Sequence, residues 1–314
     1  MNLLHENRRF NDIIDVVNKN ENINKVMIEK DYWLMHSLWG LQQQGFDFYL
    51  KGGTSLSKGY DAIYRFSEDI DILIVPPENL KVYTGKNHMK AAHIESRKRY
   101  FDWLIKNIKI PGILEVNYDP LLRPDGKWRN GDIVLNYPST TGVHQKLKKG
   151  ILLEVGFDQV SPYNKCEISS WVIDYAGRAG LDFVDNRALE VCCYNPEYTF
   201  VEKLSAISGK FRKQQETGVM DRNFLRHYYD IYMLLKRRDV QEFIGTNEYI
   251  EHKNKKFRQS DQEDLSINEA FSMNNEETFK FYSQKYLENK TLHYGEIPSF
   301  KDIMDVIRKY SAQL

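Results

Sequence analysis

Two neighbouring stretches decide the fold: KGGTSLSK at residues 51–58 and RFSEDIDI at residues 65–72. The apolar run over residues 46–50 predicts a short strand, and the two glycines after it predict a tight turn. That turn opens a helix that we expect to run to about Tyr64. Residues 70–75 are apolar with one acidic interruption, which predicts a second strand. The sequence therefore predicts a unit of strand, glycine turn, helix and strand.

This unit suits chemistry on phosphates. A glycine turn at the start of a helix presents free N–H groups at the positive end of the helix dipole, and glycine lets a phosphate approach the backbone closely. Asp69 and Asp71 lie two residues apart on a strand, so both carboxylates face the same side. They repel each other unless a cation lies between them, and Mg²⁺ is the usual cation when phosphates complete its coordination.

Each of these features has a commoner structural explanation when it occurs alone. Paired glycines usually form an ordinary tight turn, and Asp-x-Asp usually belongs to a solvated edge strand. Together, with apolar residues between the acids, they predict metal-dependent chemistry on a nucleoside triphosphate.

The remaining pattern predicts an α/β fold with two lobes. Residues 1–195 should form a mixed twisted sheet with helices, and residues 196–314 a helical lobe. In the first lobe we expect helices over 4–19, 25–44, 88–107 and 172–177 and further strands over 113–118, 132–137, 150–157 and 189–194. In the second lobe we expect helices over 197–211, 220–237, 240–251, 275–289 and 299–312.

Composition excludes several classes of protein. The 314 residues are 41% hydrophobic, enough to bury a core, and no apolar run approaches the 18 residues of a membrane span. Three cysteines are too few for a disulfide scaffold, and no CxxC or His/Cys cluster offers a zinc site. The first ten residues are too polar for a secretory signal. We expect a reduced, cytoplasmic protein with no membrane contact.

Charge is balanced overall but not along the chain. The 44 basic residues equal the 44 acidic ones, yet residues 80–150 carry a net +8 and residues 200–258 a net +5. Two basic blocks in a neutral protein fit a local groove for a polyanion. Solvated Lys and Arg faces are the commoner reason for such blocks.

The joint motif resembles the DNA polymerase β-like nucleotidyltransferase superfamily, and most of all its AbiEii/AbiGii branch. These are toxin components of type IV toxin–antitoxin and abortive-infection systems. Their first motif reads GGT-x-L and then R-x-S-x-D-I-D-hydrophobic, matched here by residues 52–56 and 65–72. The resemblance covers about residues 28–240. It implies a nucleotide site formed by Gly52, Gly53, Thr54, Ser55, Lys58, Arg65 and Ser67.

The resemblance also implies Mg²⁺, with Mn²⁺ as an alternative, bound by Asp69, Asp71 and a third carboxylate on a neighbouring strand. Glu154 is our candidate, because an acid in the centre of an apolar strand needs a reason. The alternative is an edge-strand acid that faces solvent. Asp158 and Asp132 are the second and third candidates for this position.

Two helical segments complete the resemblance. PEYTFVEKLSAI at residues 196–207 is similar to a family segment E-K-L-x-A, in which Lys203 would neutralise charge on the triphosphate. Taken alone, such a lysine is usually on the helix surface, where it contributes little to stability. RHYYDIY at residues 226–232 is similar to R-D-x-x-D-hydrophobic-Y, so Asp230 matches the motif acid. Arg226 could pair with Asp230 or with a phosphate, and an i,i+4 ion pair that docks the lobes is the structural alternative.

One further stretch, KDYW at residues 30–33, resembles a common K-D-W/Y-W segment before the first strand. We interpret it as packing and helix positioning.

The implied activity is transfer of a nucleotide from an NTP to RNA, with the tRNA 3′ end as the favoured acceptor, at a site in the cleft between the lobes. A toxin of this kind implies a cognate antitoxin protein as a partner. Two alternatives remain open from the sequence. One is a nucleotidyltransferase that modifies a protein or a small molecule such as an aminoglycoside, and the other is a non-catalytic NTP- or RNA-binding protein.

Overall fold

The predicted strand–turn–helix–strand unit forms in the computed structural model, which describes residues 1–120, 126–145, 147–258, 260–262, 264–288 and 292–314. Strand β1 (Phe48–Lys51) leads into the short helix α3 (Gly52–Thr54). A π-helical turn, η2 (Ser55–Gly59), follows, and the chain then reaches β2 (Asp69–Ile74). The helical stretch ends at Gly59 rather than near Tyr64. Asp61 has a φ of 51°, which turns the chain out of a right-handed helix.

The sheet has seven strands in the order β3-β4-β5-β2-β1-β7-β6. The β2–β5 and β1–β7 pairs are parallel and the other pairs are antiparallel, so the sheet is mixed and the α/β class is confirmed. The remaining strands are β3 (Glu115–Tyr118), β4 (Asn130–Asn136), β5 (Ile151–Gly156), β6 (Tyr163–Ile168) and β7 (Ala188–Tyr194).

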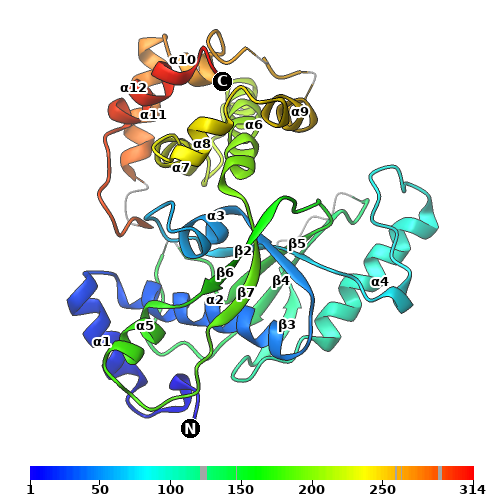
Figure 1. The fold of residues 1–314 in the computed structure, drawn as a ribbon, viewed down its shortest axis with the longest axis vertical. Helices are drawn as coiled ribbons and strands as arrows, with labels where there is room; N and C mark the ends of the chain where they lie inside the picture. Colours follow the sequence, from blue (N-terminus) through cyan, green and yellow to red (C-terminus); the bar gives the residue numbers. More distant parts are fainter. Residues whose placement is uncertain (121–125, 146, 259, 263, 289–291) are drawn as a thin grey trace. The chain divides into compact units, whose positions relative to one another are not determined.

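Helix α2 (Lys25–Gln43) is the main helix against the sheet. It contacts β5 and β7 and packs beside α1 (Phe10–Glu21) and α5 (Trp171–Arg178), and Figure 1 shows it beside the strands. Most of its residues are buried, whatever face they occupy, because neighbours surround it. The other helical segments of this unit are η1 (Leu4–Glu6), η3 (Glu78–Leu80) and α4 (Ala91–Asn107).

The chain divides into two compact units. The first contains residues 1–59 and 66–194, and the second contains residues 60–65 and 195–314. The second unit is helical, with α6 (Pro196–Thr217), α7 (Arg226–Leu234), α8 (Arg238–Phe243), α9 (Asn247–Lys256), α10 (Glu269–Ser272), α11 (Glu276–Glu288) and α12 (Phe300–Tyr310). The single helix predicted over 240–251 is two helices, separated at Gly245, whose φ is +83°.

Aromatic rings fill the core of the second unit. Phe224, Tyr228 and Tyr282 are buried in mutual ring contact, and the buried Phe300 ring contacts Tyr228. The segment 60–65 belongs to this unit, and the Tyr64 N–H donates a hydrogen bond to the Tyr229 hydroxyl. These few residues therefore leave the first unit between its strands β1 and β2.

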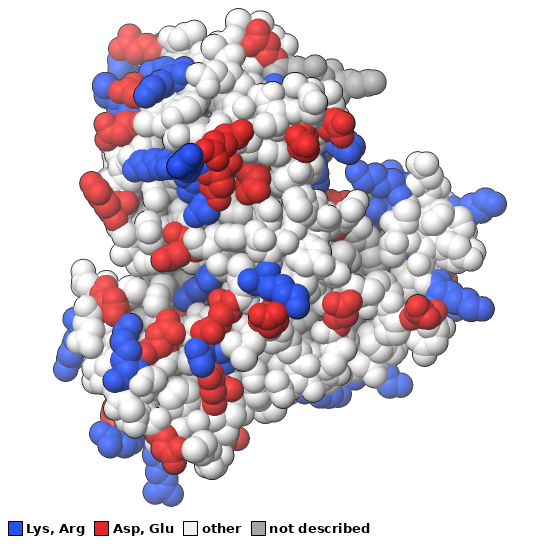
Figure 2. Space-filling model, viewed as in Figure 1, with Lys and Arg blue, Asp and Glu red and all other residues white. Residues whose placement is uncertain are grey.

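The face of the molecule in Figure 2 is mixed in charge. On the face in Figure 2, the basic and acidic side chains of the described residues are interspersed, without a large area of either sign. Within the same described residues, we find no helix whose length and apolar content would let it cross a membrane.

Candidate functional site

Strand pairing brings four acidic residues onto one face of the sheet. Asp71 on β2 is paired with Glu154 on β5, and Glu154 is paired in turn with Asp132 on β4. Asp69 lies two residues before Asp71 and therefore faces the same side. The apolar residues that alternate with them on β2, Ile70 and Ile72, are fully buried on the opposite face. The strand register thus assembles the carboxylate cluster, defined as Asp69, Asp71, Asp132 and Glu154.

The cluster carries more negative than positive charge, since four carboxyl groups share one described lysine, Lys148. Burial, and then the negative charges of Asp71 and Asp69, raise the pKa of Glu154 to about 8, and its carboxyl group hydrogen bonds to that of Asp71. Burial, and then Asp119, also raise the pKa of Asp132. These shifts favour a proton or a cation on the cluster.

Among the described residues, Lys148 is the cation in contact with the cluster, and no sequence motif had indicated it. Its Nζ lies 3.2 Å from Oδ1 of Asp69. Its backbone is fixed on both sides, because its N–H donates to the buried Glu68 carboxylate and its carbonyl accepts from Lys30 Nζ at 2.6 Å. The available signal was its place in the sequence, three residues before the strand that carries Glu154.

The glycine turn lies directly against the cluster. Gly52 has a φ of +70°, and a Cβ at this position would lie 2.0 Å from Oδ2 of Asp71, so only glycine fits. The Thr54 hydroxyl donates to the Asp69 carbonyl at 2.7 Å, and the Ser55 hydroxyl donates to the Tyr194 carbonyl at 3.3 Å. Both hydroxyls therefore support the framework. A phosphate at this turn would meet backbone N–H groups rather than these side chains.

Two other predicted nucleotide-binding residues lie in the first unit. Ser67 is half-buried just before β2. The Lys58 ammonium lies 2.8 Å from Asp31 Oδ1 and over the ring of Trp171, so its charge is already paired. Asp31 also accepts the Trp171 N–H. The KDYW stretch thus does more than pack, because Asp31 holds Lys58 and Lys30 holds Lys148.

The predicted residues of the second unit form a buried ionic cluster, which we call the Asp230 cluster. Arg65 donates to both oxygens of Asp230, at 2.6 and 2.7 Å, and Lys203 Nζ lies 2.7 Å from Oδ2. The exposed fractions are 4% for Arg65, 7% for Lys203 and 0% for Asp230. The expectation of a surface Lys203 was wrong, because an acid distant in sequence draws it into the interior.

Two cations around one carboxylate leave a net positive charge. Burial alone would raise the pKa of Asp230, but Arg65 and Lys203 hold it well below its ordinary value. Asp230 therefore remains ionised and fixes the position of both cations. The predicted site residues thus fall into two groups, one in each unit. Asp158, the second candidate for the third carboxylate, is exposed beyond the end of β5.

No group of three or more His, Cys, Asp or Glu side chains within the described ranges is arranged to hold a metal ion as the side chains lie. The donor chemistry of the carboxylate cluster nevertheless fits Mg²⁺, which prefers carboxylate oxygens. A cation would also relieve the charge that raises the pKa of Glu154.

Comparison with known proteins agrees with the motifs. Residues 34–306 match the family model described as nucleotidyl transferase AbiEii toxin, type IV TA system. The match extends through α9, α10 and α11, beyond the stretch on which the resemblance was based. Among solved structures, the chain is similar to an antigenic nucleotidyltransferase-like protein from Paracoccidioides brasiliensis. The identity is 14% and the TM-score is 0.36, over 74% of this chain and 95% of that one. None of the curated proteins gives a significant match. Because the family match covers most of its length, the chain belongs to the AbiEii family of nucleotidyltransferase toxins.

Proposed function

We propose that this nucleotidyltransferase toxin transfers a nucleoside monophosphate from an NTP to a hydroxyl of RNA, with the tRNA 3′ end as the favoured acceptor. The observation that carries the proposal is the carboxylate cluster beside the Gly52 turn. Asp71 and Glu154 lie side by side on parallel strands, and Gly52 leaves only enough room for the Asp71 carboxylate. Acids held together at such a cost to stability suit a site that takes up positive charge.

Asp69, Asp71 and Glu154 are the residues that would hold Mg²⁺. The ion would supply Lewis acidity and charge neutralisation at the transferring phosphate. Asp132 shares the same face of the sheet and would add to the negative potential around the ion. Lys148, which contacts Asp69, neutralises part of the cluster in the absence of other cations.

The NTP phosphates are proposed to meet the backbone N–H groups from Gly52 to Thr54, since the Ser55 N–H already donates to the Gly52 carbonyl. A phosphate there needs close access to the backbone, which the missing side chain of Gly53 favours, whereas the Asp71 carboxylate fills the space at Gly52. Lys203 and Arg65 would neutralise charge that develops on the triphosphate, and pyrophosphate would leave. Asp230 is a positioning residue in this scheme, because its contacts are with Arg65 and Lys203.

RNA is proposed as the acceptor on two grounds, the basic residues of the first unit and membership of the family. The basic block at residues 80–150 supplies cations in the unit that contains the carboxylate cluster, and counterion release from phosphates drives binding of nucleic acids. Membership of a type IV toxin family implies an NTP substrate and a cognate antitoxin. We propose that the toxin acts in the cytoplasm, where NTPs and tRNA are found.

The test is incubation of the protein with each α-labelled NTP, Mg²⁺ and total RNA. The expected result is label in RNA that ribonuclease removes and that EDTA prevents. Asp158→Asn serves as a matched control, since it removes an exposed acid of the same unit outside the cluster. Label in protein, or in no macromolecule, would contradict the proposed acceptor.

A further inference from the structure

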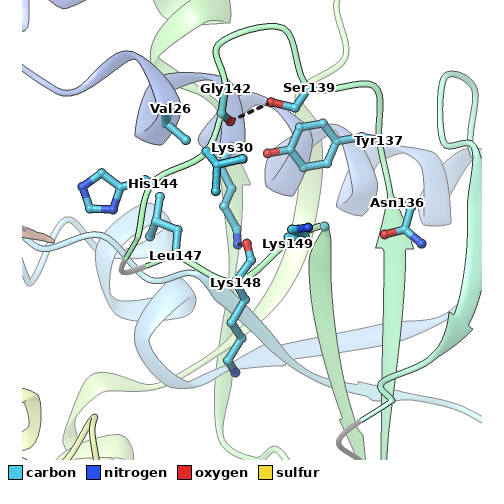
Figure 3. A pocket seen from close by; sticks show the side chains of 12 residues that line it. Val26, Lys30, Asn136, Tyr137, Ser139, Gly142, His144, Leu147, Lys148 and Lys149 are labelled. Carbon is cyan, nitrogen blue, oxygen red and sulfur yellow. Dashed lines mark hydrogen bonds between the residues drawn. The ribbon is translucent and has the colours of Figure 1, made fainter.

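A cavity lies beside the carboxylate cluster, since Lys148 both lines the cavity and contacts Asp69. It has a volume of about 230 Å³ and is formed within the first unit (Figure 3). It is lined by Val26, Lys30, Asn136, Tyr137, Ser139, Gly142, Val143, His144, Leu147, Lys148, Lys149 and Gly150. Three of these residues are lysines, and none is an aspartate or a glutamate. The lining therefore suits an anion.

Lys30 is the feature that points to a ligand. Its side chain is 1% exposed, and Figure 3 shows it running through the cavity wall to the Lys148 carbonyl, to which its Nζ donates. No ion pair with a carboxylate holds it among the described residues. The negative charges of Glu68 and Asp69 act on Lys30, but Glu68 accepts the Lys148 N–H and Asp69 contacts the Lys148 ammonium. A buried ammonium usually has an ion-pair partner, and the described residues provide none for Lys30.

The cavity wall is held in place from behind. Glu29, the neighbour of Lys30, is fully buried and accepts hydrogen bonds from Ser139, Thr140 and Thr141. These bonds tie the segment after β4 to helix α2. The Tyr137 ring stacks on Trp33, with 5.2 Å between the ring centroids. A pocket with such fixed walls is preorganised, which lowers the entropic cost of binding.

The cavity and the glycine turn lie on opposite sides of β2. The cavity is at the junction of β4 and β5, where Asn136 and Gly150 line it, whereas the glycine turn follows β1. In the sheet, β2 lies between β5 and β1. Asp69 contacts both sides, because its carbonyl accepts from Thr54 and its carboxylate accepts from Lys148. If the NTP binds at the glycine turn, this cavity therefore stays available for the other reactant, the acceptor.

The volume limits what can bind. Pockets that enclose a whole drug-sized ligand measure about 300–1,000 Å³. At about 230 Å³, the cavity is too small for an NTP and large enough for a phosphate group with part of its sugar. We propose that it binds a backbone phosphate of the acceptor polynucleotide, with Lys30 and Lys149 as the cations. The role of this polynucleotide as the acceptor rests on the proposed function, whereas the binding of its phosphate does not.

The test compares the affinities of four proteins for two probes. Lys30→Met and Lys149→Gln remove a charge from the cavity, and Lys19→Gln removes an exposed lysine on α1 as the matched control. The probes are deacylated bulk tRNA, titrated at several salt concentrations, and ATP with Mg²⁺. We expect each cavity variant to bind tRNA about tenfold more weakly and to reduce the salt slope by about 1, the value for one lost phosphate contact.

Affinity for ATP should stay within about twofold of the wild type, because the cavity does not hold the NTP. Lys30→Met should keep or raise the melting temperature, since it removes a buried charge without an ionic partner. If Lys30→Met does not fold, Lys149→Gln still tests the proposal, because replacing the exposed Lys149 should not disturb folding. Unchanged tRNA affinity in the folded variants would overturn the inference, and so would an equal loss of ATP affinity.

Binding and transfer are separate readouts, so the two proposals can fail separately. If the wild type labels RNA but the variants bind tRNA normally, the cavity assignment fails and the proposed function stands. If the wild type transfers nothing while the variants lose tRNA affinity, the proposed function fails and the cavity remains a site for a polynucleotide phosphate.

Discussion

Replacement of Glu154 by glutamine should stabilise the metal-free protein at alkaline pH. The folded protein raises the pKa of Glu154 from 4.5 to about 8, first through burial and then through Asp71. Between these two pH values the folded state retains a proton that the unfolded chain has released, so stability falls as the pH rises through this window. At 1.36 kcal/mol per pKa unit, the upper bound on the loss at pH 8 is about 4 kcal/mol. We expect about 2–4 kcal/mol, since rearrangement of the side chains relieves part of the strain.

The assay is urea denaturation of wild type, Glu154→Gln and the control Asp158→Asn at pH 5 and pH 8, in EDTA. The variant should match the wild type near pH 5 and exceed it at pH 8, while the control should follow the wild type at both. Added Mg²⁺ should stabilise the wild type at pH 8 more than the variant, because the ion needs the deprotonated carboxylate. A variant that is less stable than the wild type at both pH values would refute the reasoning.

Three further predictions concern the turn, the Asp230 cluster and the nucleotide. Gly52→Ala should lower the free energy of unfolding by more than about 1 kcal/mol in urea, since its Cβ would meet Asp71 and its φ is positive; a neutral result would mean that the turn moves freely. Asp230→Asn should lower the free energy of unfolding by about 3–5 kcal/mol, since it leaves two buried cations without an anion. Lys203→Met keeps the Arg65–Asp230 pair and should lower it by about 1–3 kcal/mol. Equal losses in the two variants would contradict the pairing of both cations with Asp230. Calorimetry should show NTP binding that EDTA weakens, and equal affinity in EDTA would exclude a bridging cation.

Local sequence patterns predicted the elements that carry the carboxylates. Apolar residues alternate with Asp69 and Asp71, and Glu154 interrupts an apolar strand, so both strands were identified from sequence. The edge strand β6 was missed because its exposed residues, such as Asn164 and Lys165, show no apolar alternation. The second unit also contains residues 60–65, which proximity in sequence had assigned to the first lobe.

Charges that pair over long sequence separations could not be predicted. Asp230 is 165 residues from Arg65. On its own helix, Lys203 has a neighbouring glutamate that suggests a surface pair. Only the fold shows that Lys203 is buried against Asp230. A surface lysine would contribute at most about 1 kcal/mol to the free energy of unfolding, and the buried Lys203 should contribute more. Lys148 was overlooked for a similar reason, because it lies in a loop and its partner Asp69 lies on β2, far away in sequence.

The most direct measurement is the rate of transfer from labelled NTP to RNA by Asp69→Asn and Asp71→Asn, with thermal unfolding and bacterial growth followed for the same variants. Each substitution keeps the size of the side chain and removes one negative charge. We predict that transfer falls by about 100-fold or more, equivalent to about 3 kcal/mol in the transition state. Growth inhibition should disappear with it, while the melting temperature holds or rises because the mutual repulsion is relieved. Wild-type transfer rates in either variant would contradict the assignment of the carboxylate cluster, and growth inhibition without transfer would show that the protein acts by binding rather than by catalysis.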